Sequence, residues 1–91
     1  MRLEMKGLDD YGVSLSEKLL ITLHNLCATS GDMAKRPDEL AQMLQVDVNE
    51  VTQILDRHVS EGYAVSFTDH EGNRRYHLTS RGIIRVCSLF S

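Results

Sequence analysis

The spacing of apolar residues changes near residue 62, and this change limits the folds that the chain can adopt. From Ser14 to Ser60, apolar residues recur every three or four positions, as they do in amphipathic helices. Residues 64–78 alternate between apolar and polar side chains instead, and residues 80–90 return to helical spacing. The 91 residues are enough for one small domain. This order predicts an α+β fold that is mostly α.

Capping residues predict where the first helix begins and ends. Residues 1–13 show no clear period, so we expect an N-terminal arm followed by one domain over residues 14–91. Ser14 and Glu17 match the S-x-x-E capping box, which predicts a helix start. Gly31 is expected to end this helix. Ile21 lies opposite the main apolar stripe of the helix, which suggests that another part of the protein covers it.

The next two predicted helices are joined by a turn of only three residues, 45–47. Pro37 suits the first position of the shorter helix, because its missing N–H has no partner there in any case. In the longer helix, over about residues 48–60, Asp47 and Glu50 are an acidic capping pair. This helix has one apolar side and one polar side. The polar side carries Asn49, Thr52, Gln53, Asp56, Arg57 and Ser60.

The segment after Gly62 is predicted to be a β-hairpin. Its strands cover residues 64–68 and 74–78, and a polar loop of five residues that contains glycine joins them. Leu78 is expected to be the last inward-facing strand residue, and Thr79 is a good N-cap for a final helix from about residue 80.

A short helix, a tight turn, a helix with a polar outer face and a β-hairpin resemble the winged helix-turn-helix superfamily, especially regulators of the MarR and ArsR types. Three stretches within residues 36–82, about half of the chain, carry this resemblance. They are residues 38–44, residues 51–62, and residues 76–82, which match the pattern Y-x-L-T-x-x-G. Gln45 stands where many relatives have glycine, so we expect an uncommon backbone conformation there or a different turn type.

The resemblance implies a sequence-specific DNA-binding transcriptional regulator. Its third helix, about residues 48–60, would enter the major groove, and the wing, residues 64–78, would lie on the DNA backbone. The base-contacting residues would then be Asn49, Thr52, Gln53, Asp56 and Arg57. The residues that contact the backbone would be Lys35, Arg36, His70, Asn73, Arg74 and Arg75. Asp56 is the awkward member, because its carboxylate would repel phosphates unless it accepts a hydrogen bond from a cytosine amine.

The formal net charge of −3 argues against strong non-specific binding to DNA by a single domain. Residues 1–63 hold six basic and eleven acidic residues, whereas residues 64–91 hold four arginines and two acids. Other interpretations remain open for the same residues. The polar helix face can be simply solvated, and Arg74 and Arg75 can pair with Asp69 or Glu71 across the hairpin. The alternative function is a winged-helix module that binds another protein and not DNA.

The apolar pattern also predicts a homodimer, because the last helix is apolar over more of its circumference than one small domain needs. The alternative is a monomer in which the N-terminal arm covers Ile21. The residues predicted to form the dimer interface are Ile21, Ile83, Ile84, Val86, Cys87 and Phe90.

Other classes of function receive no support from the sequence. It contains no phosphate-binding loop, no G-x-S-x-G and no HExxH motif, so we expect neither an enzyme nor a cofactor. The four histidines lack the spacing of metal ligands, and His58 is expected to be a hydrogen-bonded core residue. No site for a small-molecule effector can be assigned.

Cysteine usage and hydropathy predict the cellular location. Cys27 and Cys87 are expected to be reduced, buried thiols, with a disulfide or a redox switch as the alternative. The longest aliphatic run has three residues, far below the roughly 18 that span a bilayer. No apolar segment follows the basic residues near the N-terminus, as it would in a secretory signal. We therefore expect a cytoplasmic protein.

Overall fold

The computed structural model describes residues 13–90, and the predicted arm lies outside this range except for Val13. The elements in chain order are α2 (Leu15–Asn25), the 3-10 turn η1 (Gly31–Met33), α3 (Pro37–Leu44), α4 (Val48–Ser60), β1 (Ala64–Thr68), β2 (Arg74–Leu78) and α5 (Ser80–Leu89). The fold class is confirmed: these residues form four helices and one two-stranded antiparallel hairpin. None of the helices within residues 13–90 combines the length and the apolar character needed to cross a membrane.

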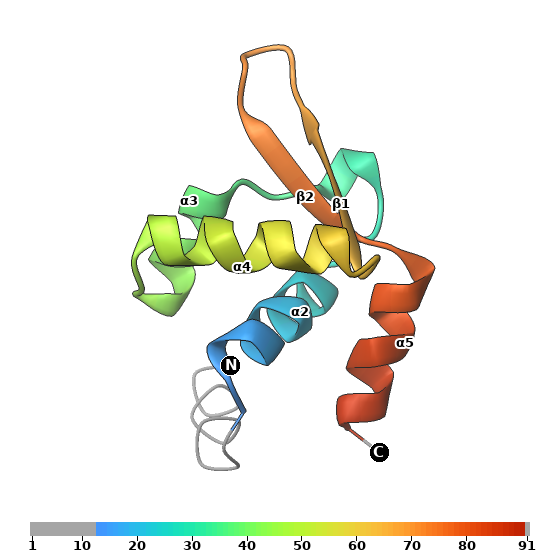
Figure 1. Ribbon diagram of the computed structural model, residues 1–91. Coiled ribbons are helices and arrows are strands. Elements are labelled where there is room, and N and C mark those ends of the chain that lie inside the picture. The colour runs from blue at the N-terminus through green and yellow to red at the C-terminus, as the bar shows by residue number, and fades with distance from the viewer. Residues whose placement is uncertain (1–12, 91) are drawn as a thin grey trace.

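The hairpin of β1, β2 and loop 69–73 rises on one side of α4, and α2 lies on the other side (Figure 1). Ala64 pairs with Leu78 and Thr68 pairs with Arg74, so the two predicted strands and the five-residue loop between them are confirmed. An isolated bridge joins Lys35 to Tyr76 on the other edge of β2. We call residues 64–78 the wing. Because β2 is bound on both edges, the wing is fixed to the segment that precedes α3.

The core lies between α2, α4, α5 and the inner face of the wing. Its apolar members come from every helix and from β2, and they are Leu19, Leu20, Ile21, Leu23, Leu40, Val51, Leu55, Tyr76, Leu78 and Val86, all of them at most 2% exposed. The end of α5 points away from the wing (Figure 1). The wing therefore projects from one end of the packed core, and its base is bound to the segment before α3 through Lys35 and to Ala28 after α2 through Leu78.

The predicted caps are present. Ser14 accepts from the backbone N–H of Glu17, and Glu17 accepts from that of Ser14, both at 3.2 Å. Asp47 begins α4 by accepting from the N–H of Glu50. Thr79 accepts from the N–H of Gly82 at 3.0 Å. These short-range bonds satisfy N–H groups that a helix start leaves without partners.

The end of the first helix differs from the prediction. The helix α2 stops at Asn25, and Gly31 begins the η1 turn instead of ending the helix. The N–H of Ala28 bonds to the carbonyl oxygen of Leu23 at 2.8 Å, and Cys27 takes a left-handed conformation with φ of 59°. A non-glycine residue thus provides the reversal that glycine usually supplies at a helix end.

Gln45 shows the uncommon conformation expected from the tight turn. Its φ and ψ are 57° and 48°, in the left-handed region. This residue ends α3, and α4 begins three positions later at Val48. The left-handed residue reverses the chain between the two helices, so the helix-turn-helix forms without glycine in the turn.

Candidate nucleic-acid interface

The outer face of α4 carries the residues predicted to contact bases. Asn49, Gln53, Asp56 and Arg57 are exposed, and Thr52 is half-buried. The hydroxyl of Thr52 donates to the carbonyl oxygen of Val48 at 2.9 Å. The opposite face places Val51, Ile54, Leu55 and His58 in the core. The predicted division of this helix into two faces is confirmed, because burial of the apolar side leaves the polar side open.

Residues from three separate parts of the chain meet in a groove of about 170 Å³ beside this face. The groove lies where the start of α3, the first half of α4 and the end of the wing loop come together. Its lining residues are Arg36, Pro37, Asp38, Val48, Thr52, Asn73 and Arg74. Four of these seven are residues that the sequence had assigned to DNA contact, so the fold brings them together.

Two arginines of this groove have acidic neighbours within 4 Å, and Arg36 has a second one, because its Nη2 lies 3.8 Å from Glu39 Oε2. Arg36 Nε lies 3.4 Å from Asp38 Oδ1, and Arg74 Nη2 lies 3.9 Å from Asp56 Oδ1. Solvent-exposed pairs of this kind contribute about 0–1 kcal/mol. Both arginines can therefore exchange a carboxylate for a phosphate at little cost, although the groove as a whole is close to neutral.

Arg75 is held more firmly and lies within the wing. Its Nε is 2.6 Å from Asp69 Oδ2, and its Nη1 donates to the carbonyl oxygen of Ala34 at 3.2 Å. The guanidinium of Arg75 holds the pKa of the Asp69 carboxyl below its usual range, with help from the N–H of Asn73. Of the two partners that the sequence left open for Arg75, the structure selects Asp69. Arg75 therefore stabilises the wing, because it joins β2 to the wing loop at Asp69 and to the backbone at Ala34.

Asp69 also shapes the loop at the tip of the wing. Its Oδ1 accepts from the backbone N–H groups of Glu71 and Asn73, both at 2.9 Å. Gly72 has φ of 83°, a conformation that side chains disfavour. His70 is exposed at this tip and Asn73 turns back into the groove. Of the two loop residues predicted to contact the DNA backbone, His70 thus lies at the tip of the wing and Asn73 lies in the groove.

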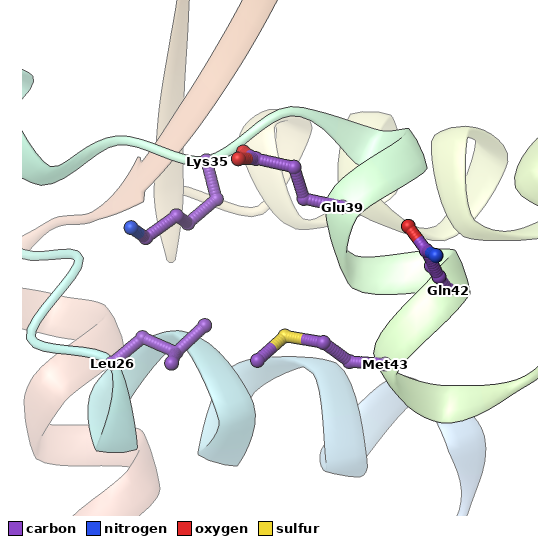
Figure 2. Close-up of a pocket in the computed structure, with 5 residues that line it drawn as sticks. All are labelled: Leu26, Lys35, Glu39, Gln42 and Met43. Atoms are coloured by element: carbon purple, nitrogen blue, oxygen red, sulfur yellow. The ribbon is translucent and has the colours of Figure 1, made fainter.

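Lys35 does not join the groove. Its backbone N–H and carbonyl oxygen bond to Tyr76 at 2.9 and 2.8 Å. Its side chain lines another cavity, of about 320 Å³, together with Leu26, Glu39, Gln42 and Met43. Figure 2 shows Leu26 and Met43 forming the apolar side of this cavity, opposite Lys35 and Glu39. The side chains of Lys35 and Arg36, which the sequence had grouped together, therefore lie in different cavities.

Tyr76 is the residue that the sequence reasoning missed. Its side chain is fully buried, and its hydroxyl donates to Asp56 Oδ1 at 2.5 Å. Burial, followed by the hydrogen bond to Asp56, raises the pKa of Tyr76 to about 12. The carboxylate that looked out of place on a DNA-contacting face is thus the partner of a core hydroxyl. The signal was present in the sequence, since Asp56 was the one base-contacting candidate with an unfavourable charge.

The predicted dimer interface needs correction at two positions. Ile21 is 1% exposed and Val86 is 0% exposed within the single chain, so neither can contact a partner. The helix α2 lies inside the domain, and its second apolar face packs within the same core. Ile84 and Phe90 on α5 are 68% and 61% exposed, and Cys87 is exposed near them in sequence. Ile83 is half-buried against the core.

The cysteine prediction is also wrong in one respect. Neither Cys27 nor Cys87 forms a disulfide, as expected, but both thiols are exposed and not buried. Cys27 follows the end of α2 and has a left-handed conformation. Within residues 13–90, no group of three or more His, Cys, Asp or Glu side chains is arranged to hold a metal ion.

These elements define a winged helix-turn-helix protein: α3, a three-residue turn and α4, followed directly by the wing. Solved structures of MarR-type regulators have this fold. The chain is 26% identical to a mutant MarR from E. coli complexed with operator DNA, with a TM-score of 0.68 over 82% of this chain. The wild-type apo form of E. coli MarR gives a TM-score of 0.69 over 96% of this chain at 24% identity. The fold of residues 13–90 is therefore the winged helix of the MarR type.

A third similar structure is the S. aureus MepR–DNA complex, with a TM-score of 0.67 and 20% identity over 98% of this chain and 75% of that chain. The present chain spans 51% and 62% of the length of the two MarR structures. No protein-family model and no curated protein sequence matches the chain.

Proposed function

We propose that this chain is a sequence-specific DNA-binding transcriptional regulator, with α4 in the major groove and the wing along the DNA backbone. The observation that carries the proposal is the groove beside the polar face of α4, where Arg36, Thr52, Asn73 and Arg74 meet. Two of the similar solved structures, of MarR and MepR, are complexes with DNA, which supports the same partner here. This function needs no catalytic residue and no cofactor, and we expect it to operate in the cytoplasm.

Each side chain has a role that follows from its chemistry. Asn49 and Gln53 present amides that can bond in pairs to an adenine edge, and Arg57 presents the fork that matches guanine. Arg36 and Arg74 flank this face from α3 and the wing, where phosphates would lie. Base contacts would set the sequence preference, and the two flanking arginines would set the register on the duplex.

We further propose that the regulator is a homodimer that uses α5. Ile84 and Phe90 expose large apolar surfaces on this helix, and such surfaces on a small protein commonly mark contacts. A two-fold dimer would present two copies of α4 to two half-sites. It would also offset the weak electrostatic attraction expected from a net charge of −3.

One observation favours the alternative, a module that binds another protein. Arg36, Arg74 and Arg75 each have a carboxylate within 4 Å, so the face beside α4 carries little net positive charge. Protein interfaces tolerate such balanced charge better than a DNA backbone does. This alternative predicts that the chain binds no duplex even at low salt.

The test is a titration of random and genomic duplexes at about 50 and about 200 mM salt, measured by fluorescence anisotropy. We expect Arg57→Ala to weaken binding to the preferred duplex by about 1–3 kcal/mol and to relax the preference at one position. Arg74→Ala should weaken binding to all duplexes alike and lower the salt slope by about 1. Arg85→Ala is the matched control, because it removes the same charge from α5, where Arg85 faces Glu17.

The control should bind as the unmodified chain does. If the chain binds no duplex at the lower salt concentration, or if the three variants behave alike, the DNA-binding function is refuted and the protein module takes its place.

A further inference from the structure

We propose that Asp56 is a positioning residue for DNA binding: through Tyr76 it fixes the wing against α4 and places Arg74 at the groove, and it does not contact a base. This inference rests on the proposed function, because it concerns the surface that would receive DNA. It also makes a claim about the protein without DNA, namely that one carboxylate locks the wing to the helix.

The hydrogen bond between β2 and α4 is short and joins the centre of the strand to the second half of the helix. Asp56 lies in the second half of α4, and Tyr76 is the central residue of β2. The Tyr76 hydroxyl donates to Asp56 Oδ1 at 2.5 Å, across 20 positions of sequence. Hydrogen bonds from a hydroxyl to a carboxylate are among the shorter and stronger ones in proteins. The contact therefore resists any change in the angle between β2 and α4.

The backbone of Tyr76 is fixed as well, so the hydroxyl contact acts on the whole hairpin. Its N–H donates to the carbonyl oxygen of Lys35, and its own carbonyl oxygen accepts from the N–H of Lys35, at 2.8 and 2.9 Å. In β1, Ser66 lies opposite Tyr76. A wing held along one edge by its backbone can still tilt about that edge, and the bond from Tyr76 to Asp56 removes this freedom.

The same carboxylate takes part in placing Arg74. The guanidinium of Arg74 lies 5.8 Å from the centre of the Tyr76 ring, and its Nη2 donates to Ser66 Oγ at 3.1 Å. Asp56 Oδ1 lies 3.9 Å from this nitrogen. Three neighbours thus keep a long, exposed side chain at the mouth of the groove, where it would meet a phosphate. Ordering this side chain in advance lowers the entropy that binding must remove.

A base-reading role would conflict with these contacts. Tyr76 is fully buried with Asp56 in place, so its hydroxyl would lose the hydrogen-bond partner that it has in the free protein if Asp56 turned away. A hydroxyl that loses its partner in the protein interior is unfavourable. If the Asp56 Oδ1 atom turned to a cytosine amine, it would exchange the Tyr76 bond for one of similar strength and would bring the carboxylate closer to the phosphates. The cheaper state leaves Asp56 where it is in the free protein.

The first part of the test uses the protein without DNA. Asp56→Asn keeps an oxygen that accepts from Tyr76, whereas Asp56→Ala and Tyr76→Phe each remove the bond. Nitrogen-15 relaxation of the backbone amides compares the wing, residues 64–78, with α4. We expect lower order parameters in the wing for Asp56→Ala and Tyr76→Phe, and wild-type values for Asp56→Asn. Equal wing mobility in all the proteins, each checked for folding by circular dichroism, would overturn the lock.

The second part measures DNA affinity and base preference on a pool of randomised duplexes. A positioning role predicts that Asp56→Ala weakens binding about tenfold for every duplex and leaves the base preference unchanged. Asp56→Asn should keep the base preference and bind at least as tightly as the wild-type chain, because it preserves the bond to Tyr76 and removes one negative charge. Gln53→Ala is the comparison variant, since this neighbouring exposed residue is assigned to a base and should change the preference at one position.

A changed base preference in Asp56→Asn would assign Asp56 to a base and overturn the proposal. A chain that binds no duplex would refute the proposed function and with it the role of Asp56 in DNA binding. In that case the relaxation data still decide whether the lock exists, so the two failures are distinguishable.

Discussion

The Nε2 atom of His58 in α4 lies 2.9 Å from the backbone carbonyl oxygen of Ser16 in α2. A carbonyl can only accept, so Nε2 carries the ring proton, and the histidine is 3% exposed. The other ring nitrogen, Nδ1, has no hydrogen-bond partner and lies 3.9 Å from a carboxylate oxygen of Glu61. A neutral histidine thus joins the proposed DNA-contacting helix to the start of α2, and His58 is a hydrogen-bonded core residue, as the sequence had predicted.

The burial of His58 makes the stability of the fold depend on pH. Burial lowers the pKa of His58, against opposing contributions from the Ser16 carbonyl and Glu61, while Arg57 and Arg85 lower it further. The unfolded chain therefore binds a proton near pH 6.5, where the folded chain does not. We expect the free energy of unfolding to fall as the pH drops through this region, and to level off below the folded pKa. Urea denaturation at a series of pH values measures it.

A histidine that lies outside the core provides the control. His70 is exposed at the tip of the wing. His70→Gln should keep the pH dependence of the wild-type chain, whereas His58→Gln should flatten it as the pH drops below about 6.5. A wild-type slope in His58→Gln would show that other groups cause the dependence.

Tyr76 should make the fold sensitive to alkali. Its pKa is raised to about 12, whereas an unfolded tyrosine ionises near pH 10. The folded chain therefore keeps its proton where the unfolded chain loses one, so the free energy of unfolding should fall as the pH rises from about 10 to about 12. The absorbance of the phenolate gives the measurement. In Tyr76→Phe, the rise in phenolate absorbance that coincides with unfolding should disappear. Tyr63→Phe is the control, because Tyr63 is half-buried, and in this variant the rise should remain.

The turn between α3 and α4 can be improved by glycine. Gln45 occupies the left-handed region, which costs a non-glycine residue about 1 kcal/mol. Gln45→Gly should therefore raise the free energy of unfolding by about 0.5–1 kcal/mol in urea denaturation, after the extra entropy of the unfolded chain is included. Gln42→Gly, an exposed change of the same kind within α3, should lower it by about 1 kcal/mol. Equal effects of the two changes would contradict this account.

Gly82 at the start of α5 leaves no room for a side chain. A Cβ atom there would overlap the carbonyl oxygen of Tyr63 and lie 3.0 Å from a methyl group of Leu78. We expect Gly82→Ala to lower the free energy of unfolding by about 3 kcal/mol or more, because the backbone of the start of the hairpin must move. Gly31→Ala is the control, since its nearest neighbour would be a Phe67 ring carbon at 3.9 Å. A thermal melt of both variants measures the difference.

The proposed dimer predicts a specific effect on association. Ile84→Asp places a charge on the apolar surface that Ile84 and Phe90 expose at α5. It should weaken self-association at least about tenfold, as measured by sedimentation equilibrium. Val65→Asp is the control, because Val65 is also an exposed apolar residue but lies on the wing. A wild-type chain that sediments as a monomer at high micromolar concentration would rule out the dimer.

The sequence by itself determined the elements and their order. The helix starts depend on residues within three or four positions of one another. These are the capping pair of Ser14 and Glu17, Pro37 at the start of α3, and Thr79 before α5. The alternation in residues 64–78 likewise predicted the two strands of the wing. Such features depend on local bonding and on which side of an element is apolar, so they can be read from one chain.

Only the tertiary structure decided which residues cooperate across the chain. The sequence could not show that Tyr76 donates a hydrogen bond to Asp56 or that Arg75 pairs with Asp69. Nor could it show that Lys35 and Arg36 line different cavities. It also misplaced Ile21, because an apolar residue on the second face of a helix can be buried by its own domain or by a partner. These outcomes depend on the angles at which helices and wing pack, and such angles come from the whole core.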